Sequence, residues 1–347
     1  MQARMKAAAL LAGLAMIATP APALAASHRT SSEHAQKDGT YTALSGLKYA
    51  ELPGNAGTLD LYLPQDSHGP IPVVLWTHGS GWLRDNGNEL GDIVANNLTE
   101  SGYAVASVAI RSSSQAQFPA QLHDAKAAVR WLRANAARYN LAGDKIAAMG
   151  DSSGGWTATM LGVTSNDSAL EGAEGVTGES SAVQAVVDLY GPTDFLQMDE
   201  NMIPGACAFF NGVFNLSYCH NDAQSPESRL IGGAIQDNPA KVAAANPLNY
   251  VDRDTPPFLI AHGTADKFVP NNQSSLLFDS LAESGVPATF YSVVGYGHDD
   301  SFLNETRNFA ERIVKRTKQD GKTVTSSGPP MTWDTVRNFL DNELRHS

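Results

Sequence analysis

Basic residues are scarce in this sequence. It contains 24 Lys and Arg against 36 Asp and Glu, which gives a formal net charge of −12 over 347 residues. Because nucleic-acid binding needs clustered Lys and Arg, this balance argues against a nucleic-acid partner. Metal-ligand spacing is also lacking among the His, Cys and carboxylate residues, so we predict no metal and no other cofactor.

Long apolar runs are lacking after the first 25 residues. Arg4 and Lys6 precede an apolar stretch over residues 7–19, and Ala23-Leu24-Ala25 offers an A-x-A cleavage site. The stretch is too short to cross a bilayer and no stop-transfer pattern follows, so residues 1–25 are predicted to be a cleaved secretory signal peptide, with an uncleaved anchor as the alternative. We expect a secreted or periplasmic protein that has no membrane contact after cleavage.

Cysteine is nearly absent. Cys207 and Cys219 are the two in the chain. In an exported protein, an even pair at short spacing predicts a disulfide, and two separate thiols are the alternative. Residues 26–40, which are mainly polar, are predicted to be a disordered leader, and residues 41–347 to form a single domain.

Apolar strand patterns alternate with helical patterns after the leader. Residues 119–140 carry apolar side chains at helical spacing, and residues 155–163 read as a second helix. This alternation predicts an α/β fold with a mainly parallel sheet and helices on both faces. The predicted strands are IPVVLWTH (71–78), YAVASVAI (103–110), KIAAMG (145–150), AVQAVVDLY (182–190), PPFLIAHG (256–263) and ATFYSVVGYGH (288–298).

Two segments interrupt this alternation. Residues 196–249 carry both cysteines and are rich in Phe, Asn and Gly, and they are predicted to be a lid-like insertion at the sheet edge where ligands bind. Residues 315–330 read as a surface loop that precedes a final helix from about Thr332.

The segment MGDSSGGW (149–156) fits two different motifs. GDSSGG is one residue away from the GDSGG of trypsin-like proteases, but that class needs an all-β chain and a serine that follows its His and Asp. The G-x-S-x-G of Gly150, Ser152 and Gly154 instead matches the nucleophile elbow of an α/β-hydrolase, which needs a strand before the serine and a helix after it. Both neighbours are predicted here, so the sequence favours the hydrolase.

Partners for a serine nucleophile follow in the chain order that this fold requires. Ser152 is the predicted nucleophile, His298 in GYGHDD its general base and acid, and Asp266 in HGTADKFVP the carboxylate that orients His298. Asp194 in YGPTDF is an alternative acid, and Ser153 an alternative nucleophile.

An upstream loop, THGSGW (77–82), follows the first buried strand. We predict that the backbone N–H groups of Ser80, Gly81 and Ser153 bind the developing oxyanion. His78 is interpreted as a loop anchor, and Asp151 as a hydrogen-bonding support beneath the elbow.

These segments, together with YGPTDF (190–195) and SPESRLIGG (225–233), resemble the hormone-sensitive-lipase-like and bifunctional feruloyl and acetyl-xylan esterases of the α/β-hydrolase superfamily. The resemblance spans about residues 45–310. It departs from the family pattern at Ser80, where a glycine is usual, and at Ser153, where an alanine is usual. The resemblance implies an exported serine carboxylic-ester hydrolase that acts on short-chain or aromatic esters, of the acetyl or feruloyl type, whether small molecules or linked to a polysaccharide.

Aromatic residues near these motifs are candidates for a substrate pocket, and packing of the lid onto the domain is their alternative role. A serine peptidase or amidase of prolyl-oligopeptidase-like catalytic type, and a non-enzymatic binding protein on a hydrolase fold, are the other functions considered. The pocket candidates are Trp82, Trp156, Phe209, Phe210 and Phe214.

Overall fold

The computed structural model describes residues 34–304, 311–317 and 322–345. The predicted signal peptide lies outside these residues. These described residues belong to one compact unit. Its sheet has the strand order β1-β2-β3-β5-β4-β6-β7-β8-β9-β10-β11. The strands are β1 (His34–Asp38), β2 (Tyr41–Lys48), β3 (Thr58–Pro64), β4 (Ile71–Thr77), β5 (Ala104–Val108), β6 (Leu141–Asp151), β7 (Ala185–Leu189), β8 (Phe258–Gly263), β9 (Ala288–Val293), β10 (Arg312–Thr317) and β11 (Thr323–Ser326).

The centre of the sheet is parallel, as predicted. Strands β5, β4, β6, β7, β8 and β9 pair in parallel, whereas the strands outside them pair antiparallel. Strands β4, β6, β7 and β8 therefore all end at the same edge, and the motif loops that follow them meet there.

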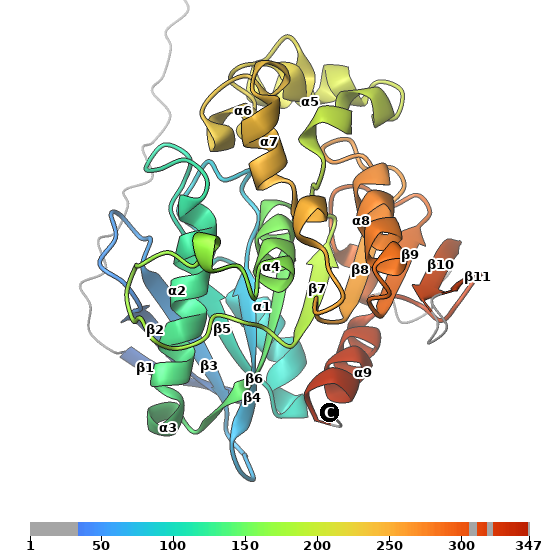
Figure 1. Cartoon of the computed structure of the whole chain (residues 1–347). Helices are drawn as coiled ribbons and strands as arrows, with labels where there is room; N and C mark the ends of the chain where they lie inside the picture. Colours follow the sequence, from blue (N-terminus) through green and yellow to red (C-terminus); the bar gives the residue numbers. More distant parts are fainter. Residues whose placement is uncertain (1–33, 305–310, 318–321, 346–347) are drawn as a thin grey trace, which may run out of the picture. The chain divides into compact units, whose positions relative to one another are not determined.

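Helices cover both faces of the sheet. Alternate residues of β4 divide between two buried clusters: Val73 and Leu75 pack under α2, α4 and α8, whereas Val74 and Trp76 pack under α1 and α9 (Figure 1). Helix α4 is buried along its whole length, which explains its apolar sequence on every side. The helices are α1 (Gly91–Leu98), α2 (Ala120–Ala134), α3 (Ala136–Tyr139), α4 (Ser153–Val163), α5 (Ala206–Phe214), α6 (Pro226–Ile231), α7 (Pro239–Ala245), α8 (Asn272–Glu283) and α9 (Trp333–Leu344).

The predicted insertion lies between β7 and β8 and contains α5, α6 and α7, which stand beyond the ends of the parallel strands (Figure 1). The predicted disulfide is confirmed: Cys207 in α5 is bonded to Cys219, with 5.5 Å between their Cα atoms. This bond ties α5 to the segment that leads into α6.

Two predictions about irregular segments are wrong in part. Residues 34–38 of the supposed leader form β1, which pairs with β2 across a tight turn. The supposed loop 315–330 includes the end of β10 and all of β11, which form an antiparallel pair. Every residue of β11 is exposed. Edge strands of this kind are held by backbone hydrogen bonds, so no buried apolar pattern marks them in the sequence.

Candidate active site

Ser152 stands alone between the end of β6 and the start of α4. Its φ and ψ angles are 53° and −125°, a conformation that costs a residue with a side chain about 1–3 kcal/mol. The turn is closed so tightly that a Cβ on Gly150 would overlap the Gly154 carbonyl, and a Cβ on Gly154 would overlap the Thr77 carbonyl. Both glycines of the motif are therefore needed because backbone atoms approach them closely, as the elbow interpretation predicts.

The structure brings the three predicted catalytic side chains into one hydrogen-bonded chain. His298 Nε2 lies 2.8 Å from Ser152 Oγ, and His298 Nδ1 lies 2.7 Å from Asp266 Oδ2. Ser152 is partly accessible and the His298 side chain is 17% exposed, whereas the Asp266 side chain is fully buried. The accessible end of this chain is the serine, where a substrate can reach it.

Asp266 accepts hydrogen bonds on both carboxylate oxygens. Oδ1 accepts the backbone N–H groups of Phe268 at 2.7 Å and Val269 at 3.0 Å. Oδ2 accepts His298 and, at 3.2 Å, Nε2 of His262. Burial by itself would raise the pKa of Asp266, but the charge and hydrogen bonds of the two histidines outweigh it and hold that pKa well below its usual range. Asp266 is therefore ionised at neutral pH.

The alternative assignments are not supported by the geometry. Asp194 caps a short 3₁₀ helix by accepting the Leu196 N–H at 3.2 Å, and its other oxygen accepts the Gln197 side chain at 2.7 Å. The Ser153 hydroxyl points to the loop after β4 and accepts the Ser80 N–H at 2.9 Å. Neither side chain is bonded to His298.

The loop after β4 packs directly against the elbow. A Cβ on Gly79 would lie 2.5 Å from the Ser152 Cβ, so only a glycine fits there. Asp151 Oδ1 holds the loop by accepting the Gly79 N–H at 2.8 Å, and it lies 3.0 Å from His78 Nδ1. His78 thus occupies the anchoring position that was predicted for it.

The predicted set of oxyanion donors needs one correction. The Ser80 N–H is occupied by Ser153 Oγ, which also accepts the Trp82 N–H at 3.4 Å. The Gly81 and Ser153 N–H groups have no acceptor among the described residues. Two of the three predicted donors are therefore free, and the third is held by the hydroxyl that replaces the usual alanine side chain.

The predicted aromatic pocket also needs correction. Trp156 is fully buried and Trp82 is 3% exposed; their rings meet edge to face, and Trp156 Nε1 donates to the Ala245 carbonyl at the end of α7. Trp156 therefore anchors the insertion to the core, and Trp82 packs against Trp156 and Phe195, so burial favours the packing role that was the alternative for both. Of the phenylalanines, Phe210 is buried and Phe209 is 43% exposed. Phe214 is half-buried and its ring lies against Phe210.

Two aromatic residues near His298 were not predicted, and His262, which the sequence indicates to be structural, contacts the acid. The centroid of the Phe268 ring lies 5.1 Å from that of the His298 ring. Tyr190, which follows the last residue of β7, has its ring centroid 4.8 Å from that of His298. His262 Nε2 donates to Asp266 Oδ2. Phe268 and His262 both belong to the HGTADKFVP segment, so their closeness in sequence to Asp266 was the available signal.

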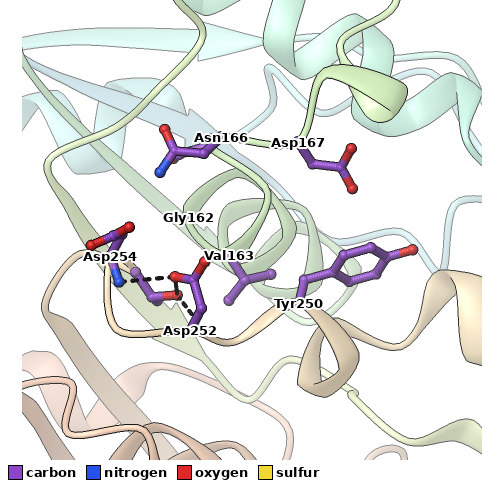
Figure 2. A pocket seen from close by; sticks show the side chains of 9 residues that line it. Gly162, Val163, Asn166, Asp167, Tyr250, Asp252 and Asp254 are labelled. Atoms are coloured by element: carbon purple, nitrogen blue, oxygen red, sulfur yellow. Dashed lines mark hydrogen bonds between the residues drawn. The ribbon is translucent and has the colours of Figure 1, made fainter.

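A separate acidic pocket lies at the other end of α4. Figure 2 shows Asp252 and Asp254 across this pocket of about 210 Å³ from Asn166 and Asp167. Helix α4 has 11 residues, so the pocket lies roughly 16 Å along it from Ser152. Within the residues that the structure describes, no group of three or more His, Cys, Asp or Glu is arranged to hold a metal ion. In the same residues, no helix is both long enough and apolar enough to cross a bilayer.

The parallel sheet, the elbow serine and the Ser–His–Asp arrangement define an α/β-hydrolase. Within this class the chain belongs to the BD-FAE family, whose model matches residues 59–281. A truncated carbohydrate esterase from gut microbiota superposes with a TM-score of 0.70 at 31% identity, covering 89% of this chain and 99% of that one. A bifunctional GH43-CE protein of Bacteroides eggerthii superposes equally well at 32% identity, covering 87% of this chain and 35% of that one.

Curated relatives are named as esterases too. Esterase LipC of Mycobacterium tuberculosis is 27% identical over 239 residues, which cover 69% of this chain and 55% of LipC. The chain spans about half the length of the curated relatives it matches.

Proposed function

We propose that this protein is an exported serine carboxylic-ester hydrolase that works through an acyl-enzyme. The single observation that carries the proposal is the unbroken hydrogen-bonded chain Ser152–His298–Asp266 beside free backbone donors. Because ionised Asp266 only accepts, Nδ1 of His298 donates to it. In the neutral imidazole Nε2 is then the nitrogen without hydrogen, and it can take the proton from Ser152.

The chemistry follows from this arrangement. Ser152 Oγ attacks the ester carbonyl as His298 takes its proton, and the negative charge on the carbonyl oxygen is bound by the N–H groups of Gly81 and Ser153. His298 then returns the proton to the departing alcohol, and the acyl group stays on Ser152. Water, activated by His298 in the same way, releases the acid and restores the serine. Asp266 orients the imidazole and stabilises its charged form throughout.

The substrate class we propose is short-chain or aromatic esters, of the acetyl or feruloyl type. The likeness to a carbohydrate esterase supports it, as does the membership of BD-FAE. Aromatic rings close to His298, above all Phe268, offer a flat apolar surface for an acyl group. Secretion is part of the proposal because of the N-terminal residues 1–25.

The test is hydrolysis by the chain that begins at Ala26. A panel would hold p-nitrophenyl esters from acetate to palmitate, methyl ferulate, acetylated xylan and an aminoacyl anilide, each run beside Ser152→Ala. We expect cleavage of short-chain or aromatic esters that disappears in the variant. Cleavage of the anilide alone would favour the peptidase alternative, and activity that survives in Ser152→Ala would overturn the assigned nucleophile.

A further inference from the structure

A buried histidine connects the insertion to the loop that carries Asp266. His220 lies in the segment after α5, is 0% exposed, and is covered by the Phe210 ring, whose centroid is 4.1 Å from the imidazole centroid. Its Nδ1 lies 2.7 Å from Asp199 Oδ1, and its Nε2 lies 2.9 Å from the backbone carbonyl oxygen of Phe268. Asp199 also accepts the His220 N–H at 3.0 Å.

Both partners of the ring can only accept hydrogen bonds when Asp199 is ionised. A carbonyl oxygen has no proton to donate, and neither has a carboxylate, so both ring nitrogens of His220 must carry hydrogen. The ring is then an imidazolium. Burial lowers the pKa of His220, but the nearby Glu227 carboxyl and the hydrogen bond to Asp199 outweigh it, and the pKa is raised overall.

Glu227 is the acidic residue, besides Asp199, whose charge raises the pKa of His220. Among the residues that the structure describes, Oε2 of Glu227 on α6 has no hydrogen-bond partner, and burial raises the pKa of Glu227 itself. Lys267, in the loop that carries Asp266, lies over the Phe209 ring, 5.4 Å from its centroid. Asp199 and Glu227 are thus the acidic groups that set the charge of His220.

Phe268 contacts His220, Asp266 and His298, so a small displacement of Phe268 would be transmitted to the catalytic side chains. Its carbonyl accepts from His220, its N–H donates to Asp266 Oδ1 at 2.7 Å, and its ring lies 5.1 Å from the His298 ring. Phe268 therefore connects the insertion with the acid, Asp266, and with the base, His298.

We propose that His220 is a positioning residue for the proposed hydrolase: a buried imidazolium that holds the Phe268 backbone, and through it Asp266 and His298, in the reactive arrangement. This inference rests on the proposed function of the same site. It also gives the insertion a role in catalysis, since the insertion supplies the donor that fixes the loop carrying Asp266.

Two variants separate the two hydrogen bonds of His220. In His220→Gln the side-chain amide nitrogen reaches the place of Nε2 and can still donate to the Phe268 carbonyl. In His220→Asn the amide nitrogen reaches only the place of Nδ1, so it can donate to Asp199 but leaves the Phe268 carbonyl without a donor. The two variants are matched in polarity and in loss of charge.

The experiment measures kcat and KM on the best ester of the panel, and the rate of covalent labelling by a fluorophosphonate, with thermal melting as a check of folding. We expect His220→Asn to lose roughly tenfold or more in kcat and in labelling rate, because small misplacements of catalytic groups are costly. His220→Gln should remain within about threefold of wild type on the same scale. Equal activity in all three proteins, or an equal loss in both folded variants, would overturn the proposal.

The pH profile supplies a readout that a purely structural role would not change. A group whose pKa is raised by folding contributes at low pH, and its contribution is lost as the pH rises through the raised value. When His220 loses a proton, the Asp199 carboxylate retains the hydrogen on Nδ1, so the hydrogen that is lost is the one on Nε2 that binds the Phe268 carbonyl. Wild type should therefore lose kcat on the alkaline side, and His220→Gln should lack that loss. An identical alkaline decline in both proteins would contradict the proposal.

Nitrogen NMR of histidine-labelled protein tests the charge without any substrate. The His220 signals, assigned by their absence in His220→Gln, should show protons on both ring nitrogens at neutral pH. A single protonated nitrogen would overturn the proposal even if no ester is hydrolysed. Failure of wild type to hydrolyse or to be labelled, with both nitrogens protonated, would instead overturn the proposed function.

Discussion

The hydroxyl of Ser153 accepts the backbone N–H of Ser80 at 2.9 Å, and this bond joins the elbow to the loop after β4. The same oxygen accepts the Trp82 N–H. Gly81, whose N–H is free, lies between these two attached residues. Ser153 therefore shapes the oxyanion loop in two ways: its own N–H is a proposed donor, and its side chain fixes the residues on either side of the other donor.

Ser153→Ala should lower kcat while the fold is kept. It removes the acceptor of two N–H groups, and a hydrogen bond of this kind contributes about 1 kcal/mol, so we expect a loss of roughly fivefold. The measurement is kcat on a p-nitrophenyl ester. Ser80→Ala is the matched control, because it keeps the backbone N–H and removes only an exposed hydroxyl that bonds to the Arg84 carbonyl. If Ser153→Ala turns over as fast as wild type, the active arrangement of the oxyanion loop does not depend on the Ser153 hydroxyl.

Asp266→Asn should nearly abolish turnover. The amide cannot stabilise an imidazolium and can favour the wrong His298 tautomer, which in comparable triads costs about 10⁴-fold in kcat. Asp194→Asn is the comparison, since Asp194 caps the 3₁₀ helix Phe195–Gln197 and also accepts the Gln197 side chain, but has no bond to His298. It should keep kcat near wild type. A large loss in Asp194→Asn with an active Asp266→Asn would reverse the assignment of the acid.

The low pKa of Asp266 predicts an acid-dependent stability. A carboxyl whose pKa is depressed by folding stabilises the protein above its unfolded pKa of about 4, and this stabilisation is lost as the pH falls through the depressed folded value. Chemical unfolding of wild type and Asp266→Asn at pH 7 and in steps below pH 4 measures it. The stability difference between them should be largest at pH 7 and shrink in acid, whereas a difference independent of pH would contradict the cause given for the shift.

Removal of the disulfide should weaken the insertion. Replacing both Cys207 and Cys219 with alanine opens a loop with a sequence separation of 12, for which chain entropy predicts about 2–3 kcal/mol of lost stability. Thermal melting compares the double variant with wild type, and a reducing agent on wild type should have the same effect. Unchanged melting in both experiments would mean that the bond does not constrain α5.

The local parts of the site could be predicted from sequence because their signals are local. Gly150, Ser152 and Gly154 define a turn whose backbone contacts exclude side chains, and Asp266 and His298 each follow an apolar strand of the same sheet. The disulfide could be predicted from only two cysteines at short spacing. The parallel sheet followed from the alternation of strand and helix.

The remaining features depend on contacts that no sequence pattern marks. Trp156 lies beside the nucleophile in sequence, but its position on α4 directs it into the core, where the carbonyl at the end of α7 accepts its N–H. Ser80 loses its free N–H to a side chain 73 positions later. The strands β1 and β11 at the two edges of the sheet are mainly polar, and composition does not distinguish them from loops.

Covalent labelling tests most directly whether Ser152 is an activated nucleophile. The protein that begins at Ala26 would be treated with a fluorophosphonate and examined by intact and peptide mass spectrometry, beside Ser152→Ala. We expect one adduct per chain, on the peptide that contains Ser152, and none in the variant. An unlabelled folded wild type, or an adduct that persists in Ser152→Ala, would contradict it.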